Sequence, residues 1–135
     1  MNTLNQKISE IGVVPVIKLN HPERDAAPLA KALCEGGVPV AEVTFRAAGA
    51  PAAIKAMKTT CPDMIVGAGT VLTVEQVELA HKAGAAYMIS PDTNPEVIKR
   101  TKELGCISIP GAMTPTEVMT AHAAGADFVK LFPAG

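Results

Sequence analysis

The segment His81-Lys82-Ala83-Gly84-Ala85-Ala86-Tyr87-Met88-Ile89 joins the end of a predicted helix to a short apolar strand. Glycine adopts the left-handed backbone conformation that closes a helix without a steric penalty, so Gly84 is expected to end the helix. The same order of residues recurs around Gly36, Gly105 and Gly125. Helix and strand therefore alternate along the chain, which is typical of an α/β protein with a parallel sheet.

Helix starts are marked as clearly as helix ends. Thr73-Val74-Glu75-Gln76 and Thr114-Pro115-Thr116-Glu117 fit the capping box, in which a threonine hydroxyl and a later Gln or Glu side chain satisfy the first amides of a helix. These signals predict a helix near 2–10 and further helices near 22–35, 49–59, 74–83, 95–104 and 115–124. The short apolar runs between them predict strands near 12–18, 38–45, 64–68, 86–90, 106–110 and 127–132.

The length of 135 residues accommodates one domain with a single core. Parallel strands joined by helices either stay open as a doubly wound sheet or close as a (β/α)₈ barrel. Length alone favours the open sheet, because a complete barrel needs at least about 200 residues.

Composition narrows the class of function. Hydrophobic residues make up 48% and aromatic residues 3% of the chain, which favours an aliphatic core around a buried parallel sheet. The net charge of -1 gives no reason to expect a nucleic-acid partner. With no signal-peptide pattern and no apolar run long enough to span a membrane, we expect a cytoplasmic protein. Three widely spaced cysteines, Cys34, Cys61 and Cys106, indicate neither a disulfide framework nor a metal site.

Lys130 stands in the otherwise apolar segment Phe128-Val129-Lys130-Leu131-Phe132. Strand alternation puts Phe128, Lys130 and Phe132 on one face. Loss of hydration in such a setting lowers the pKa of a lysine from about 10.4, and the resulting amine is a usable nucleophile toward a carbonyl. The alternative is a lysine at a strand end that reaches solvent and has no chemical role.

Glu42, Thr44 and Arg46 share one face of another predicted strand, opposite Val43 and Phe45. A carboxylate beside a guanidinium at a strand end could serve as a general acid/base next to an anchor for a substrate carboxylate. An internal Glu/Arg pair that satisfies itself is the alternative.

The segment Val66-Gly67-Ala68-Gly69-Thr70 superficially suggests a dinucleotide-binding loop. The third glycine of that motif would fall at Leu72, so a nicotinamide site is poorly supported. The glycines could let the backbone approach a small ligand beside the Thr70 hydroxyl, or simply allow tight packing of a helix on the strand.

Five segments at predicted strand ends resemble, in order and spacing, motifs of the 2-keto-3-deoxy-6-phosphogluconate (KDPG) and 2-keto-4-hydroxyglutarate (KHG) aldolase family. They are Glu42-Val43-Thr44-Phe45-Arg46, Val66-Gly67-Ala68-Gly69-Thr70-Val71, Ile89-Ser90-Pro91, Ile109-Pro110-Gly111-Ala112-Met113-Thr114-Pro115-Thr116-Glu117 and Lys130-Leu131-Phe132-Pro133-Ala134. The resemblance implies a TIM (β/α)₈ barrel of the class I aldolase type. Residues 1–135 would be the N-terminal portion of that single barrel, with only its first six strands.

The resemblance also implies roles for individual residues. Lys130 would form a Schiff base with the C2 ketone of a 2-keto acid, and Glu42 would act as general acid/base. Arg46 and Thr70 would hold the carboxylate of the pyruvate unit. The implied reaction cleaves KDPG to pyruvate and glyceraldehyde 3-phosphate, and KHG to pyruvate and glyoxylate.

Three further residues carry implied binding roles. Phe132 and Pro91 would pack beside the imine, and Lys18 would face the distal, phosphate-bearing end of the substrate. The family is usually trimeric and uses no metal or cofactor. Its distal phosphate site lies largely in loops after strands seven and eight, which this sequence lacks.

Two other functions stay open. The chain could be an aldolase for 2-keto-3-deoxy-6-phosphogalactonate, because the loops that discriminate between substrates are not present. It could also be a non-catalytic half-barrel that acts only in assembly or interaction. An open flavodoxin-like ligand-binding domain is permitted by length but is not favoured by the motifs.

Overall fold

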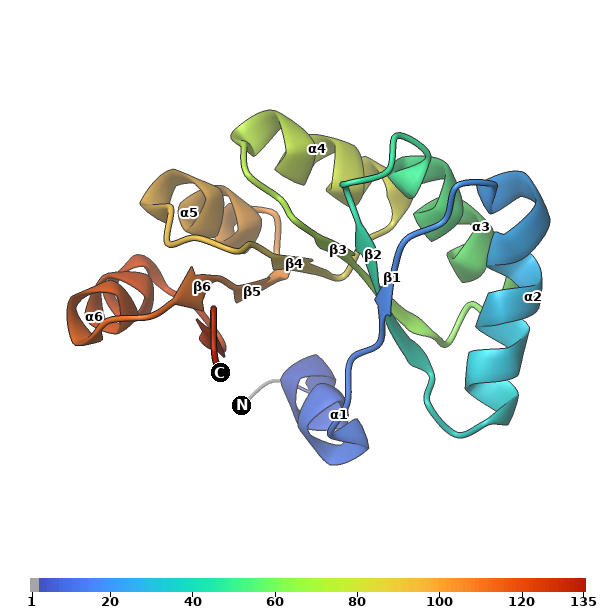
Figure 1. Ribbon diagram of the computed structural model, residues 1–135, viewed down its shortest axis with the longest axis horizontal. Helices are drawn as coiled ribbons and strands as arrows, with labels where there is room; N and C mark the ends of the chain where they lie inside the picture. The colour runs from blue at the N-terminus through green and yellow to red at the C-terminus, as the bar shows by residue number, and fades with distance from the viewer. Residues whose placement is uncertain (1–2) are drawn as a thin grey trace.

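The computed structural model describes residues 3–135 and shows the predicted alternation of helix and strand (Figure 1). Residue 2, the first residue of the predicted leading helix, lies outside the described residues. The helices are α1 (Thr3–Ile11), α2 (Pro22–Glu35), α3 (Ala50–Thr60), α4 (Val74–Ala83), α5 (Pro95–Glu103) and α6 (Pro115–Ala124). The strands are β1 (Val16–Ile17), β2 (Val40–Thr44), β3 (Ile65–Gly69), β4 (Tyr87–Ile89), β5 (Ile107–Ile109), β6 (Gly111–Ala112) and β7 (Lys130–Leu131).

The main sheet is parallel, and its strands follow the order of the chain. Its five strands pair in the order β1-β2-β3-β4-β5. A doubly wound sheet reverses its strand order and carries helices on both faces. Here the crossover helices α2 to α5 lie along one side of the curved sheet (Figure 1). The open doubly wound alternative is therefore wrong, and the arrangement is that of part of a barrel.

The strand predicted at 106–110 differs from expectation, because strand structure resumes beyond Pro110 as β6. Proline has no backbone N–H, so the ladder is interrupted there. Its carbonyl still accepts a hydrogen bond from the Lys130 amide at 2.8 Å. The final predicted strand, 127–132, is regular only over β7, which pairs with β6 in a separate two-stranded sheet. The strand predicted at 12–18 is likewise reduced to β1.

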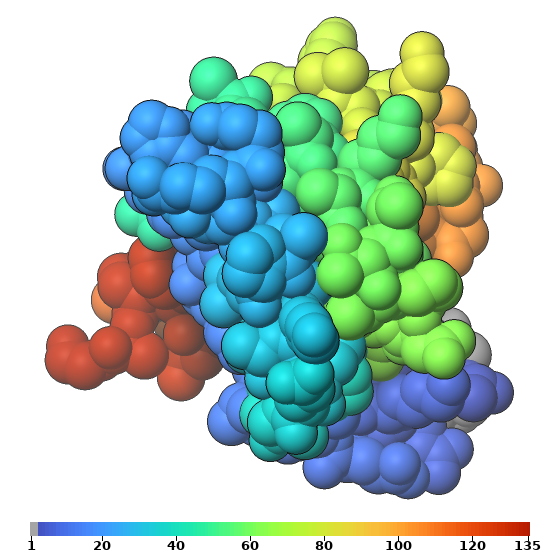
Figure 2. Space-filling model, turned by 90° about the vertical axis from the view of Figure 1, so that its right-hand side faces the viewer, coloured from blue at the N-terminus to red at the C-terminus, as the bar shows by residue number. Residues whose placement is uncertain are grey.

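Two apolar clusters lie on opposite faces of the sheet. The outer cluster fills the space between the strands and helices α2 to α5, and it includes Val43, Val66 and Met88. Figure 2 shows α2 and α3 side by side on this outer side, with the C-terminal segment projecting at the lower left. The inner cluster includes Ile8 of α1 and the strand residues Val40, Ile65, Tyr87, Ile89, Ile107 and Ile109. Helix α1 therefore packs against the inner face of the sheet.

Asp127 ties three parts of the chain together just before β7. Its carboxylate accepts hydrogen bonds from the Asn5 amide at 3.2 Å, from the Lys102 ammonium at 2.6 Å and from the Ser108 backbone N–H at 2.9 Å. Burial disfavours the charged form of Asp127, but the Lys102 ammonium and the two amide donors outweigh it. They hold the pKa of Asp127 below its usual range.

Helix boundaries follow the predicted signals. Thr114 and Glu117 form a complete capping box, and the Thr73 hydroxyl accepts from the Gln76 amide at 3.2 Å. The Gln76 side chain accepts from Leu72 rather than from Thr73, so the second box is only half formed. Gly84 and Gly125 close their helices with positive φ angles of 107° and 104°, as expected.

Among residues 3–135, none of the helices is both long enough and apolar enough to cross a membrane. The expectation of a cytoplasmic protein remains a prediction. Cys106 is buried, whereas Cys34 and Cys61 are half-buried, and all three are free thiols.

We predict that Asp127→Asn destabilises the protein at neutral pH by about 1.5–3 kcal/mol, because it removes charge-assisted hydrogen bonds. A lowered native-state pKa stabilises the fold above the unfolded value of about 3.9 and is lost as pH falls through the native value. The difference between wild type and Asp127→Asn in urea unfolding should therefore shrink in acid. Asp63→Asn, at an exposed position, is the matched control. A difference that persists unchanged in acid would contradict this account.

Candidate active site

A cavity of about 370 Å³ opens where the parallel strands end. Its lining comes from β1, from the ends of β2, β3 and β4, and from β7 and the residue after it. The lining residues are Val16, Glu42, Arg46, Thr70, Pro91, Lys130 and Phe132. Loops at the carboxyl ends of parallel strands are where α/β barrels bind their ligands.

The cavity brings together six of the seven predicted site residues, and Lys18 is the exception. Lys18 follows β1, is exposed and does not line the cavity. Val16 lines it instead, although sequence reasoning did not identify this residue. The signal was available only in the strand register, because β1 pairs with β2 so that Val16 lies beside Glu42.

Glu42 is the buried carboxylate of the cavity, with 5% of the residue exposed. Burial raises the pKa of Glu42, while the positive charges of Lys130 and Arg46 partly oppose the rise. No ion pair joins Glu42 to Arg46 among residues 3–135. The alternative of a self-satisfied internal Glu/Arg pair is therefore not what the structure shows.

The two glycines of β3 provide space for side chains on the inner face of the sheet. A Cβ atom at Gly69 would lie 2.0 Å from a carboxylate oxygen of Glu42. A Cβ atom at Gly67 would lie 2.2 Å from the ring of Tyr87, whose hydroxyl donates to the Ala41 carbonyl at 2.5 Å. Close approach of a side chain, rather than helix packing alone, thus requires glycine at both positions.

Lys130 projects from β7 toward the same cavity. Its ammonium lies 4.5 Å from the centre of the Phe132 ring, at a distance typical of a cation–π contact. Phe128 and Lys130 both line a second cavity, on the inner face of the sheet, so the predicted shared face is confirmed. Lys130 is half-buried rather than fully desolvated, because β7 has a paired neighbour on only one side within residues 3–135.

Arg46 and Thr70 are connected through Thr44. The Thr44 and Thr70 hydroxyl oxygens are 2.9 Å apart, and the Arg46 Nε–H donates to the Thr44 hydroxyl at 3.2 Å. Thr70 has a φ of 57°, in the left-handed region that β-branched residues avoid. Such a conformation costs about 1–3 kcal/mol and is concentrated at functional sites.

The second cavity, here called the interior cavity, is mostly apolar, has a volume of about 340 Å³ and lies on the inner face of the sheet. Val16, Glu42 and Lys130 line both cavities, so the two cavities adjoin along these residues. The remaining lining residues of the interior cavity are Ile8, Val14, Ile89, Ile109 and Phe128. The carboxylate and the amine thus border an apolar surface on one side.

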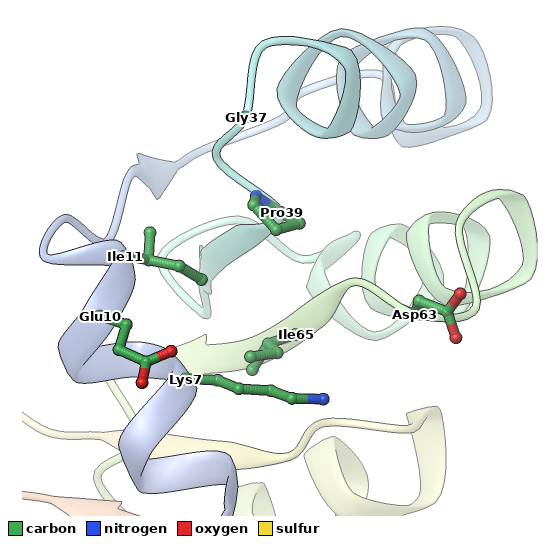
Figure 3. Close-up of a pocket in the computed structure, with 7 residues that line it drawn as sticks. All are labelled: Lys7, Glu10, Ile11, Gly37, Pro39, Asp63 and Ile65. Carbon is green, nitrogen blue, oxygen red and sulfur yellow. The ribbon is translucent and has the colours of Figure 1, made fainter.

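A larger hollow of about 490 Å³ lies at the opposite end of the strands (Figure 3). Its lining comes from α1, from the residues just before β2 and from the start of β3 with the loop before it, and includes Gly37, Pro39, Asp63 and Ile65. The amino ends of barrel strands serve stability rather than catalysis. The smaller cavity with Glu42 and Lys130 is therefore the candidate active site.

Comparisons with known proteins bear on the family of the chain and on its fold. The profile of the family described as KDPG and KHG aldolase matches residues 4–135. The 2-dehydro-3-deoxy-phosphogluconate aldolase of Treponema pallidum (strain Nichols) is 44% identical over 99% of this chain and 63% of its own length. The chain therefore spans less than two thirds of that relative.

Solved structures give the same result. The KDPG aldolase of Zymomonas mobilis ZM4, with 3-phosphoglycerate, is 35% identical with a TM-score of 0.85, over 96% of this chain and 63% of that one. The KDPG aldolase of Legionella pneumophila, with pyruvate captured as a covalent carbinolamine, is 39% identical with a TM-score of 0.83, over 90% of this chain and 58% of that one. The predicted class I aldolase barrel, present in part, is confirmed.

Glu42→Gln should stabilise the folded protein above neutral pH. Because burial raises the pKa of Glu42, ionisation of the buried carboxyl opposes folding once pH exceeds its native pKa, and glutamine avoids that cost. Urea unfolding should give a higher midpoint for Glu42→Gln than for wild type at about pH 8, and the gap should close toward about pH 5. Glu35→Gln, at an exposed position, should show no such trend. A destabilised Glu42→Gln at high pH would refute the burial argument.

Proposed function

The chain belongs to the KDPG and KHG aldolase family, and on that premise we propose that it carries the Schiff-base site of a class I aldolase. The proposed reaction is reversible cleavage of KDPG to pyruvate and glyceraldehyde 3-phosphate, with KHG as a second substrate. The observation that supports it best is the shared cavity of Lys130 and Glu42, beside the cationic Arg46 and the Thr70 hydroxyl.

Imine formation begins at Lys130. The unprotonated amine attacks the C2 ketone of the substrate to give a carbinolamine, which loses water to form a protonated imine. Glu42 borders the same cavity and carries a carboxyl with a raised pKa, so it can deliver the proton with which the hydroxyl leaves as water. Burial favours the protonated form that this step requires.

Cleavage then uses the opposite protonation state of Glu42. The carboxylate takes the proton of the C4 hydroxyl, the C3–C4 bond breaks, and its electrons flow into the protonated imine to leave an enamine. The aldehyde departs, the enamine is protonated at C3, and water hydrolyses the imine to release pyruvate and Lys130. A single group alternates between acid and base when its pKa is raised toward the working pH.

We assign the anchor for the substrate carboxylate to Arg46 and Thr70, which line the same cavity as Lys130. Arg46 offers a guanidinium and Thr70 offers a hydroxyl at this place. Pro91 and Phe132 supply apolar walls beside the proposed imine. Lys18 lies outside the lining, and we propose that it meets the distal phosphate of a longer substrate beyond the mouth of the cavity.

A half-barrel with only a structural role does not need a lysine and a buried carboxylate at one cavity, and their juxtaposition favours chemistry. An aldolase for 2-keto-3-deoxy-6-phosphogalactonate would use the same pyruvate half-site. Cleavage rates for the two epimeric substrates would separate that function from the KDPG reaction.

Incubation with pyruvate and borohydride should add one reduced pyruvyl group to Lys130, detected by intact mass and peptide mapping. Lys130→Ala should abolish the adduct, whereas Lys99→Ala, at an exposed position on α5, should leave it unchanged. A folded sample that forms no adduct at saturating pyruvate would support the non-catalytic alternative.

Glu42→Gln should slow cleavage of KDPG by about 10²–10⁴-fold.

We further propose a homotrimer, as the family resemblance implies. The described surface carries exposed large apolar side chains, among them Met113, Met119 and Leu131. Apolar side chains favour association where they form a contiguous surface patch. Light scattering on the purified protein should give the mass of a trimer, and a monomer at all concentrations would contradict this assembly.

A further inference from the structure

Thr44 is a buried residue that sits beneath the proposed carboxylate anchor without lining the cavity. Only 1% of it is exposed, and it is the last residue of β2. Its hydroxyl oxygen is 3.2 Å from the backbone nitrogen of Arg46, 3.2 Å from the Nε of Arg46 and 2.9 Å from the hydroxyl oxygen of Thr70. Thr44 thus contacts both groups of the proposed anchor.

The numbers of donors and acceptors on these groups determine the direction of each hydrogen bond. A threonine hydroxyl has one proton and two acceptor lone pairs. Both nitrogens of Arg46 can only donate to Thr44, so they occupy the two acceptor positions. The single proton of the Thr44 hydroxyl must then be donated to Thr70. The Thr70 hydroxyl accepts this bond and keeps its own proton available for another acceptor.

The same bonds decide which part of Arg46 can meet a substrate. The Nε–H is committed to Thr44, so the terminal Nη groups are the donors left to face the cavity. The backbone N–H bond to Thr44 additionally fixes the position of Arg46 relative to the end of β2. Guanidinium and hydroxyl are therefore both presented as donors, and their acceptor would be an anion.

We propose that Thr44 is a positioning residue that makes the site selective for a carboxylate, by forcing the Thr70 hydroxyl to donate and by orienting Arg46. The proposal rests on the proposed aldolase function for the identity of the ligand. Packing alone does not explain the hydroxyl, because valine would have nearly the same shape and a high strand propensity at this position. The strained backbone of Thr70 is a second sign that the place of its hydroxyl matters.

The test compares Thr44→Val with Thr44→Ser by borohydride trapping of pyruvate and of pyruvamide, which has the same ketone but a neutral amide. Thr44→Val should raise the half-saturating concentration of pyruvate by about 10- to 100-fold, the range expected for lost hydrogen bonds to a charged group. The value for pyruvamide should change little. Thr44→Ser, which keeps the hydroxyl, should restore the pyruvate value.

Equal weakening of both ligands by Thr44→Val would show a purely structural role and overturn the proposal, as would no effect on either. Thr70→Val is the second variant, because it removes the donor at a more exposed position and should reproduce the loss specific to pyruvate. Unfolding midpoints of all variants show whether each one is folded.

A separate readout keeps this inference distinguishable from the aldolase reaction itself. The Arg46 Nε–H resonance, followed by NMR during titration with pyruvate, reports binding of the anion without any imine. Lys130→Ala should retain a saturable shift of this resonance, and Thr44→Val combined with Lys130→Ala should weaken it. If wild type shows a saturable shift but forms no adduct, the aldolase function is refuted and the role of Thr44 is not. No saturable shift in wild type would overturn the role of Thr44.

Discussion

Backbone pairing between the segment 127–132 and the chain around Pro110 is the constraint on which the site depends. The amides of Asp127, Lys130 and Phe132 donate to the carbonyls of Ser108, Pro110 and Ala112. This ladder brings Lys130 to the same cavity as Glu42, although the two residues belong to different sheets. The ladder survives the proline because a carbonyl, and not an amide, is needed at that position.

The site also requires free volume on the inner face of the sheet. The inner face of β3 carries no side chain at Gly67 and Gly69, and the ring of Tyr87 and the carboxylate of Glu42 occupy the positions that side chains there would fill. Burial disfavours the charged form of the Glu42 carboxyl, and nearby positive charge partly offsets that effect. The glycines provide the volume, and Lys130 and Arg46 provide the charge.

Much of this arrangement was predictable from local signals. Glycine caps and threonine N-caps predicted the helix boundaries closely. Strand alternation predicted that Glu42 shares a face with Thr44, and Lys130 with Phe128. The role of Val16 was not predictable, since it depends on how β1 is aligned with β2. The exposure of Lys18 and the partial exposure of Lys130 also depend on tertiary neighbours, which no local pattern encodes.

The anchor of α1 has a consequence for the order of folding. Asn5 and Asp127 are 122 positions apart, so their hydrogen bond closes a loop that includes nearly every element of the structure. Contacts of such long sequence separation form late, because the entropy of closure must be offset by structure already in place. During synthesis the first helix is made before the residue that holds it. Until Asp127 has been synthesised, α1 is not held against the inner face of the sheet, and the apolar residues of that face stay exposed. Chaperone binding is most useful during this interval.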